Sequence, residues 1–361
     1  MSGRLMPITA SRARRPAPRI EGAYFYRGKR FEPVSPSLKA RDRLGSLRMR
    51  LGLGRMRYAV PPGLYARGKP GPASPVFVTA NYTMSFDALR SALAGLEAWI
   101  LVLDTKGVNV WCAAGKGSFG TEELLQRIEA TRLPDMVDHR ELILPQLGAP
   151  GVSAPELARR SGFKAVWGPV RAADIGPWLA AGRRKDEAMR TVRFSLPDRL
   201  TVALLELVQA WPATLIALGL GSLLALPASS GWAGRAAAWS GLFLGGVLTG
   251  TIATPALLPY LPGKAFAVKG ATVGAAWALV YGLTGLHFLG DAGPLARVLA
   301  VAGGVLATAP VSAFLAMNFT GASTFTCQPG ALLEVEKGFG PMLGSAAAGL
   351  AALAAAKFLG A

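Results

Sequence analysis

The chain has 361 residues, a formal net charge of +18 and a positive mean hydropathy of +0.35. An ordinary soluble domain does not combine so much charge with so apolar a composition, so the two properties must belong to different segments. The two cysteines, Cys112 and Cys327, lie on different parts of the chain, and one of the two histidines, His287, lies near an apolar, span-like segment. A zinc or iron–sulfur centre built by this chain alone is therefore not expected, because such centres need about four protein ligands in one place.

Residues 1–70 are predicted to form a basic, largely irregular arm. Residues 1–60 hold fifteen Arg or Lys against three acidic residues, with Pro, Gly and Ser interspersed and little hydrophobic periodicity. Nothing in this segment matches a nucleic-acid-binding module, so no nucleic-acid partner is predicted. An anionic membrane surface is the favoured target of the charge.

Residues 71–195 alternate between strand and helix patterns and predict an α/β domain with a mostly parallel, Rossmann-like sheet. Apolar runs of the kind buried in parallel sheets predict strands at 76–80, 98–105, 141–144 and 164–170. A helix follows the first strand, with Ser85 as a candidate cap, and another starts near Thr121. Ser153 caps a third helix, which ends near Gly162.

The segment NVWCAAGK, residues 109–116, places Cys112 in the loop after the strand at 98–105. An isolated cysteine is most often a small buried thiol. The position favours function, because open α/β sheets bind ligands at the carboxyl ends of their strands and the first turn of a helix stabilises a thiolate. One thiolate cannot hold a metal ion by itself. The metal would therefore arrive in a cofactor that supplies most of its own ligands, such as a macrocycle that lacks one axial ligand.

Residues 200–361 are predicted to be an all-α membrane domain of five transmembrane helices. Five windows without Asp, Glu, Lys or Arg can each hold a span of about 20 residues: 207–234, 236–263, 270–290, 298–333 and 338–356. The five windows predict a multi-pass protein of the inner (cytoplasmic) membrane. Basic residues ahead of the first window predict that its soluble domain lies in the cytoplasm, and five spans then place its carboxyl terminus outside. No secretory h-region contradicts this orientation. The GxxxG pairs Gly246/Gly250 and Gly270/Gly274 are interpreted as helix-packing sites.

NVWCAAGK resembles the cap-helix motif of the corrinoid protein of mercury methylation, the HgcA family. The corrinoid domain of that family resembles the large subunit of the corrinoid iron–sulfur protein of acetyl-CoA synthesis. Similar stretches extend over roughly residues 75–360: VTANYTMSFDALR (78–90), LVLDTKGVNVWCAAGKGSFGTEEL (101–124), HRELILPQLGAPGVSA (139–154), GFKAVWGPVRAADI (162–175) and MNFTGASTFT (317–326). The iron–sulfur protein lacks a membrane domain. The membrane domain predicted for this chain therefore favours the mercury-methylation family.

The resemblance implies a cobalamin-type corrinoid bound in base-off form, with Cys112 as the lower axial ligand of cobalt and the catalytic residue. The cap helix beneath the corrin would consist of Asn109, Val110, Trp111, Cys112, Ala113, Ala114, Gly115 and Lys116. Small residues at 113–115 would allow the corrin to approach closely. Further contacts to the corrin or its nucleotide tail would come from loops at strand ends: Thr79, Asn81, Gln146, Gly148 and Gly168. For each of these five residues, an ordinary turn role stays open.

The activity that the resemblance implies is corrinoid-dependent methyl transfer to Hg(II), which forms methylmercury. A thiolate opposite the methyl group donates more charge than imidazole does, which favours transfer to a soft, electrophilic ion. The family takes its methyl group from a methylated folate and is re-reduced by a small ferredoxin with two 4Fe-4S clusters. Both are therefore expected partners, with Hg(II) as substrate.

Two other functions stay open. A membrane-bound corrinoid methyl carrier of one-carbon metabolism, similar to the acetyl-CoA pathway, would use the same cofactor and ligand with a different acceptor. A transporter with a ligand-sensing α/β domain would need polar groups within its spans, and these are scarce apart from Asn318. Cys327 is interpreted as a small buried membrane residue rather than a mercury ligand.

Overall fold

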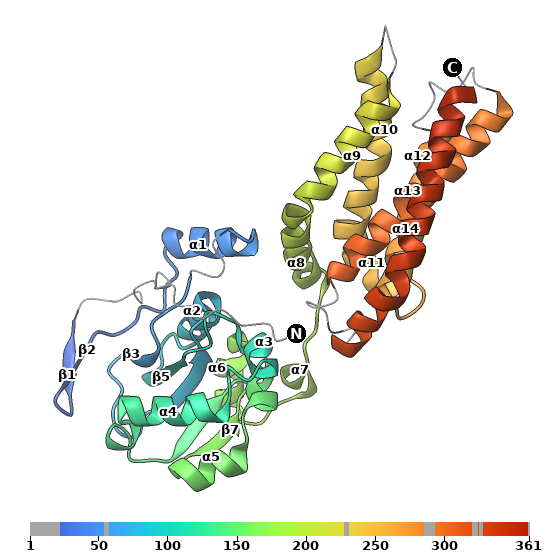
Figure 1. Cartoon of the computed structure of the whole chain (residues 1–361). Helices are drawn as coiled ribbons and strands as arrows, with labels where there is room; N and C mark the ends of the chain where they lie inside the picture. Colours follow the sequence, from blue (N-terminus) through green and yellow to red (C-terminus); the bar gives the residue numbers. More distant parts are fainter. Residues whose placement is uncertain are drawn as a thin grey trace, which may run out of the picture. The chain divides into compact units, whose positions relative to one another are not determined.

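The computed structural model of the chain describes residues 22–53, 58–226, 231–284, 293–319, 324 and 328–359 (Figure 1). These residues form two compact units. The first unit comprises Leu53–Arg193 with the described part of Met1–Met49, and the second comprises Arg50–Gly52 with the described part of Phe194–Ala361.

The first unit is built on a five-stranded sheet in the order β3-β5-β4-β6-β7. Its strands are β3 (Gly63–Arg67), β4 (Val76–Ala80), β5 (Ala98–Leu103), β6 (Glu141–Leu144) and β7 (Lys164–Trp167). Four strands run parallel, and β3 pairs antiparallel with β5 at one edge. Every residue of β4 and β5 is buried, which explains why Thr79 is the one polar residue in these two strands. The predicted α/β class with a mostly parallel sheet is confirmed, with β3 as the one antiparallel strand of this five-stranded sheet.

Helices cover both faces of this sheet (Figure 1). Successive side chains of a strand point to opposite faces, so Val78 packs with Phe119 and Leu124, whereas Phe77 packs with Phe86 and Trp178 on the other face. The connecting elements are α2 (Thr83–Ala92), α3 (Val110–Gly115), α4 (Thr121–Thr131), η2 (Leu133–Asp135), η3 (Gln146–Gly151), α5 (Ala154–Ser161), η4 (Ala172–Asp174), α6 (Ile175–Ala180) and α7 (Glu187–Arg190).

The interpretation of residues 1–70 as a largely irregular arm is wrong for much of its described part. That part contains a hairpin of β1 (Tyr24–Tyr26) and β2 (Lys29–Phe31), the helix α1 (Ala40–Arg50) and the edge strand β3. Tyr26 and Phe31 lie 5.5 and 4.9 Å from Trp99, measured between ring centroids. These elements are held by partners far away in the sequence, which the local charge pattern does not reveal.

The second unit is helical. Its elements are α8 (Leu196–Gln209), α9 (Trp211–Leu224), α10 (Trp232–Leu248), a π-helical turn η5 (Thr249–Ala253), α11 (Thr254–Leu257), η6 (Leu258–Tyr260), α12 (Phe266–Thr284), α13 (Pro294–Asn318) and α14 (Gln328–Leu359). Among the described residues, four helices are long and apolar enough to cross a membrane: Trp232–Tyr260, Phe266–Thr284, Pro294–Asn318 and Gly330–Leu359.

The first of the five predicted spans is not one straight helix. α8 and α9 are bent by 57° against each other, and only the two together reach the length and composition of a further span. Pro212 lies in the first turn of α9 and lacks the N–H that would continue the hydrogen-bond ladder from α8. The count of candidate spans is therefore four, or five with the bent pair.

The GxxxG glycines pack against α13, as their spacing predicts. A Cβ atom at Gly250 would lie 2.7 Å from the carbonyl oxygen of Ser312, and one at Gly274 would lie 2.5 Å from the Ser312 Cβ. A Cβ at Gly246 would lie 2.5 Å from a methyl carbon of Thr308. These distances are too short for any side chain, so glycine permits the close helix contacts.

Candidate functional site

Cys112 lies on an exposed face of α3, in the loop that follows the central strand β5. Asn109 is the N-cap of this helix, and its side-chain oxygen accepts a hydrogen bond from the backbone N–H of Cys112 at 2.9 Å. Val110, Ala113 and Ala114 are buried, whereas Trp111 and Cys112 are exposed. The short helix therefore packs by one side and presents a thiol on the other.

The small residues of α3 have a packing role that was not predicted. Ala113 and Ala114 face the interior rather than the exposed side of the helix. Beside them, a Cβ at Gly151 would lie 2.0 Å from the carbonyl oxygen of Phe119 and 3.0 Å from the Cα of Ala114. A Cβ at Gly148 would lie 2.5 Å from the Phe119 ring. Small residues thus allow η3 to approach α3 on its buried side. Gly115 and Lys116 are exposed, as Cys112 is.

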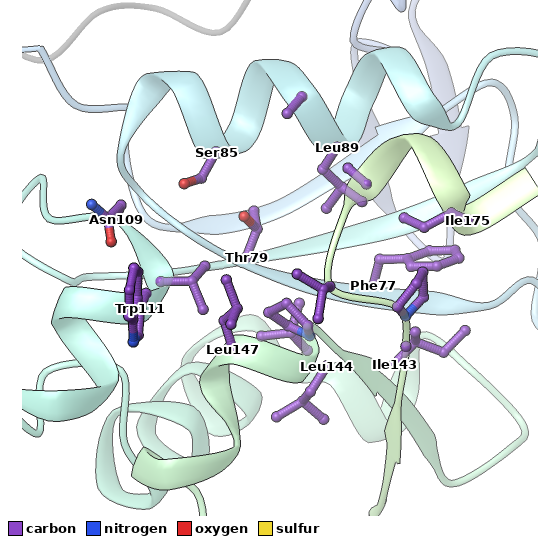
Figure 2. A pocket seen from close by; sticks show the side chains of 18 residues that line it. Phe77, Thr79, Ser85, Leu89, Asn109, Trp111, Ile143, Leu144, Leu147 and Ile175 are labelled. Atoms are coloured by element: carbon purple, nitrogen blue, oxygen red, sulfur yellow. The ribbon is translucent and has the colours of Figure 1, made fainter. Parts of the chain in front are cut away.

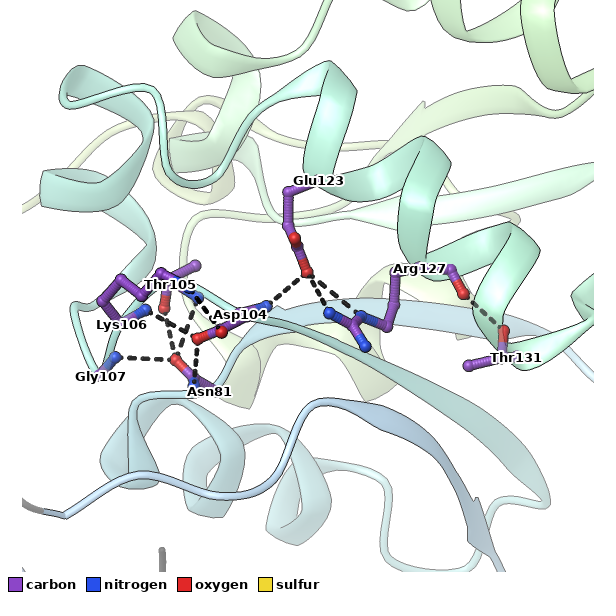
Figure 3. A network of polar contacts seen from close by, with 8 residues as sticks. All are labelled: Asn81, Asp104, Thr105, Lys106, Gly107, Glu123, Arg127 and Thr131. Carbon is purple, nitrogen blue, oxygen red and sulfur yellow. Dashed lines mark hydrogen bonds and ion pairs between the residues drawn. The ribbon is translucent and has the colours of Figure 1, made fainter. Parts of the chain in front are cut away.

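A buried asparagine fixes the loop that leads to α3. Figure 3 shows Asn81, at the end of β4, reaching the turn after β5. Its side-chain oxygen accepts hydrogen bonds from the N–H of Thr105 at 3.1 Å, the N–H of Gly107 at 2.9 Å and the Thr105 hydroxyl at 2.8 Å. Its amide nitrogen donates to Asp104 at 3.1 Å. Asn81 is therefore engaged in positioning the loop, which favours the turn role that stayed open for it.

The same turn is strained and anchored from a second side. Lys106 has a φ of 59°, which is unusual for a residue with a side chain, and Gly107 follows with a φ of 74°, which glycine adopts readily. The N–H of Asp104 donates to Glu123 of α4 at 2.7 Å, and Arg127 donates to the same carboxylate at 2.8 Å (Figure 3). Bonds from two elements thus hold a turn that a free chain would rarely adopt.

A cavity of about 320 Å³ opens beside α3, at the carboxyl ends of β4, β6 and β7. Figure 2 shows Asn109 and Trp111 near one end of this cavity, Thr79, Ser85 and Leu147 around its middle, and Phe77, Ile143 and Ile175 near the other end. Its walls are mostly apolar. Within the described part of the chain, the hydroxyls of Thr79 and Ser85 form no hydrogen bond, so they are available to a ligand.

Lys185, which the sequence did not single out, links the loop after β6 to the loop after β7. Lys185, between α6 and α7, donates a hydrogen bond to the side-chain oxygen of Gln146 and one of 3.3 Å to the carbonyl of Gly168. Burial lowers the pKa of Lys185, and nearby Arg190 lowers it further. No spacing in the sequence signals this contact, because its partners lie 39 and 17 residues away.

The structure gathers only part of the predicted set around the cavity. Five of the residues line it: Thr79, Asn109, Val110, Trp111 and Gly168. The others contribute no lining side chain: Asn81, Cys112, Ala113, Ala114, Gly115, Lys116, Gln146 and Gly148. Of these, Cys112, Gly115 and Lys116 are exposed beside it on α3, and Gln146 lies at the rim. Cys327 lies outside the described residues.

The donor set fits a cofactor that brings its own metal ligands. Within the described ranges, no group of three or more His, Cys, Asp or Glu side chains could hold a metal ion. The site offers one exposed thiol on α3, an adjoining apolar cavity, and the hydroxyls of Thr79 on β4 and Ser85 on α2. This combination suits a large, mostly apolar ring that needs a single axial ligand.

Comparisons with known proteins agree on this unit of the chain. Residues 52–177 match the family model described as the CO dehydrogenase/acetyl-CoA synthase delta subunit. The chain is also similar to the acetyl-CoA decarbonylase/synthase complex subunit gamma of Archaeoglobus fulgidus, with 36% identity over 122 residues, which is 33% of this chain and 26% of the relative. The same subunit of Methanocaldococcus jannaschii is 32% identical over 123 residues, which is 34% of this chain and 25% of the relative.

The chain thus spans about a quarter of the length of these relatives. The matches support the relation, expected from the sequence, between the α/β unit and the corrinoid domain of acetyl-CoA synthesis. They do not bear on the mercury-methylation family. The two named relatives are subunits of a complex.

Proposed function

We propose that the α/β unit binds a cobalamin-type corrinoid in base-off form and takes part in methyl transfer, with Cys112 as the lower axial ligand of cobalt. The observation that carries this proposal is an exposed thiol on a capped helix at the strand ends, beside an apolar cavity. The similarity to acetyl-CoA decarbonylase/synthase subunits supports it.

The residues of this chain divide the binding task. The exposed side of α3, with Trp111, Cys112 and Gly115, would meet the ring. The cavity would take the displaced base and its tail, with Thr79 and Ser85 as hydroxyl partners. When bound, the corrinoid supplies a cobalt that carries a methyl group from donor to acceptor.

The role of the protein is to hold the ligand sulfur in place. A thiol loses its proton when it ligates a metal, so Cys112 would contribute a negative charge beneath the ring. Asn109 holds the Cys112 backbone at 2.9 Å, and Asn81 fixes the turn before it. Both are positioning residues, because in this proposal neither touches the cobalt.

The methyl acceptor is the finer part of the proposal, and we propose Hg(II). The comparisons by themselves favour the second candidate, a membrane-bound carrier of one-carbon metabolism, because the relatives are named for acetyl-CoA decarbonylase/synthase. Mercury methylation rests on the likeness of NVWCAAGK to the mercury-methylation motif and on the helical unit that follows the α/β unit in the chain. A methylated folate as methyl source and a ferredoxin with two 4Fe-4S clusters as electron donor belong to the mercury proposal.

We further propose that the helical unit spans the inner membrane with the α/β unit in the cytoplasm. Four candidate spans and the bent α8–α9 pair support this location. Arg190 and Arg193 precede α8 directly, as the positive-inside rule requires for a cytoplasmic amino-terminal flank.

The test is a methyl-transfer assay with the full chain in lipid nanodiscs, loaded with carbon-13 methylcobalamin and supplied with a low-potential reductant. Hg(II) and a one-carbon acceptor complex are offered in parallel. The mercury proposal predicts labelled methylmercury from the parent protein and its loss in Cys112→Ala, with Cys327→Ser as the matched control that keeps activity. Label in the one-carbon acceptor alone would establish the second candidate instead.

A further inference from the structure

Helix α1 presents an unusual outward face. In most surface helices the leucines face the core and the charges face water. In α1 the single acidic residue, Asp42, is 3% exposed, whereas Leu44 and Leu47 are 58% and 50% exposed. The helix therefore points its carboxylate inward and its two leucines outward.

This orientation is fixed by specific contacts rather than by loose packing. Asp42 pairs at 2.9 Å with Arg90 of α2, which is fully buried and also pairs with Asp87 at 2.7 Å. Asp42 further accepts a hydrogen bond from the N–H of Lys39 at 3.1 Å. On the same side, a Cβ at Gly45 would lie 2.9 Å from the Tyr58 hydroxyl. Rotation of α1 to hide its leucines would break a buried ion pair.

Basic residues flank the outward leucines. At 100° per residue, Leu44 and Leu47 lie near the centre of the outward face, with Arg43 on one side and Arg41 and Arg48 on the other. All three arginines are exposed, and among the described residues none of them forms an ion pair. We call these five residues the α1 face: Arg41, Arg43, Leu44, Leu47 and Arg48.

We infer that the α1 face docks onto the anionic surface of the lipid bilayer. Leucines inserted at the level of the acyl chains, with arginines that reach back to lipid phosphates, are the arrangement of interfacial helices. An acidic protein or a nucleic acid would use the arginines but leave the leucines without an apolar partner. The inference goes beyond the proposed methyl transfer and rests on the proposal that the helical unit of this chain is membrane-embedded, which keeps a bilayer surface within reach of the first unit.

The experiment places a fluorophore on the α1 face of the full chain. Leu47→Cys in a Cys112→Ser, Cys327→Ser background is labelled with an environment-sensitive dye and reconstituted into nanodiscs that contain spin-labelled lipid. The inference predicts blue-shifted emission and strong quenching when the discs contain phosphatidylglycerol, and clear loss of both in phosphatidylcholine alone or at high salt. A dye at Glu129→Cys, on an exposed position of α4, should stay unquenched.

Charge variants distinguish binding through the α1 face from a general attraction of the basic protein to anionic lipid. Arg43→Gln with Arg48→Gln should markedly reduce the quenching, whereas Arg159→Gln with Arg184→Gln, which removes the same charge elsewhere, should not. Label at Leu44→Cys repeats the measurement without altering Leu47. Absence of lipid quenching at both label positions would overturn the inference, as would equal quenching in neutral and anionic discs. A shift of the dye emission on addition of an acidic protein or a nucleic acid, without quenching by the spin-labelled lipid, would assign the face to that partner instead.

Discussion

The side-chain oxygen of Asn109 accepts a hydrogen bond from the N–H of Cys112, so the residue that starts α3 also fixes the backbone of the candidate cobalt ligand. Asn109→Ala should lower the free energy of unfolding by about 1 kcal/mol, and Asn109→Ser should recover most of it. Denaturant unfolding measures the loss, and the absorption spectrum of bound corrinoid reports the ligand. Ser153→Ala removes the corresponding cap of α5 and serves as control, because it should cost similar stability without changing that spectrum.

Asn81 is expected to be more important for stability than its position in a loop suggests. Asn81→Ala leaves the buried N–H of Gly107 without its acceptor and leaves the N–H of Thr105 with only the carbonyl of Leu103. The cost should be about 2 to 4 kcal/mol, with weaker corrinoid binding because the turn before Cys112 loosens. Unfolding midpoints and corrinoid titration check this. Gln126→Ala, on an exposed position of α4, should change neither, and an Asn81→Ala protein with parental stability would contradict the positioning role.

The cavity beside α3 can be filled from one wall. Ala88 of α2 lines it, so Ala88→Phe should occupy part of its volume of about 320 Å³ and weaken corrinoid binding at least about tenfold, with the secondary structure retained. Ala94→Phe, placed at an exposed position just after α2, is the matched substitution and should bind as the parent does. Equal affinities for the two variants, measured by titration with hydroxocobalamin, would show that the ligand does not enter the cavity.

An ion pair between α4 and α5 should make stability depend on acidity. The hydrogen bond from Arg160 holds the pKa of the Glu122 carboxyl below its usual value. Because the folded value is depressed, the pair stabilises the protein above about pH 4.3, the unfolded value, and this contribution disappears as the pH falls through the folded pKa. Glu122→Gln should therefore lower the unfolding midpoint near neutrality and not at the acidic end. Glu129→Gln, which has no ion pair among the described residues, should lower it at neither.

The sequence predicts those helices and strands that can be recognised from their own residues, by an apolar run or by cap residues at their ends. β4 and β5 were found because both of their faces are covered, and Ser153 and Gly162 bound α5 as expected, with Gly162 at φ 75°. Ser85 was expected to cap α2, yet the helix begins at Thr83 and Ser85 lines the cavity.

Contacts between residues far apart in the chain could not be predicted from the sequence. The pairing of Asp42 with Arg90 joins residues 48 positions apart and turns a basic segment into an ordered helix. The contact of Lys185 with Gln146 spans 39 positions. At the site, NVWCAAGK predicted where the thiol lies, whereas the inward direction of Ala113 and Ala114 depends on Gly151 and Phe119 of neighbouring loops.

The most direct test of the account is the cobalt K-edge X-ray absorption of the full chain loaded with hydroxocobalamin. If Cys112 is the lower axial ligand, the parent protein should show a sulfur scatterer in the first coordination sphere of cobalt, and Cys112→Ala should lack it while unfolding at a similar midpoint. Cys112→His should replace sulfur by nitrogen, since imidazole can also ligate cobalt. A parent spectrum without sulfur, or a sulfur signal that persists in Cys112→Ala, would contradict the assignment of Cys112 to cobalt.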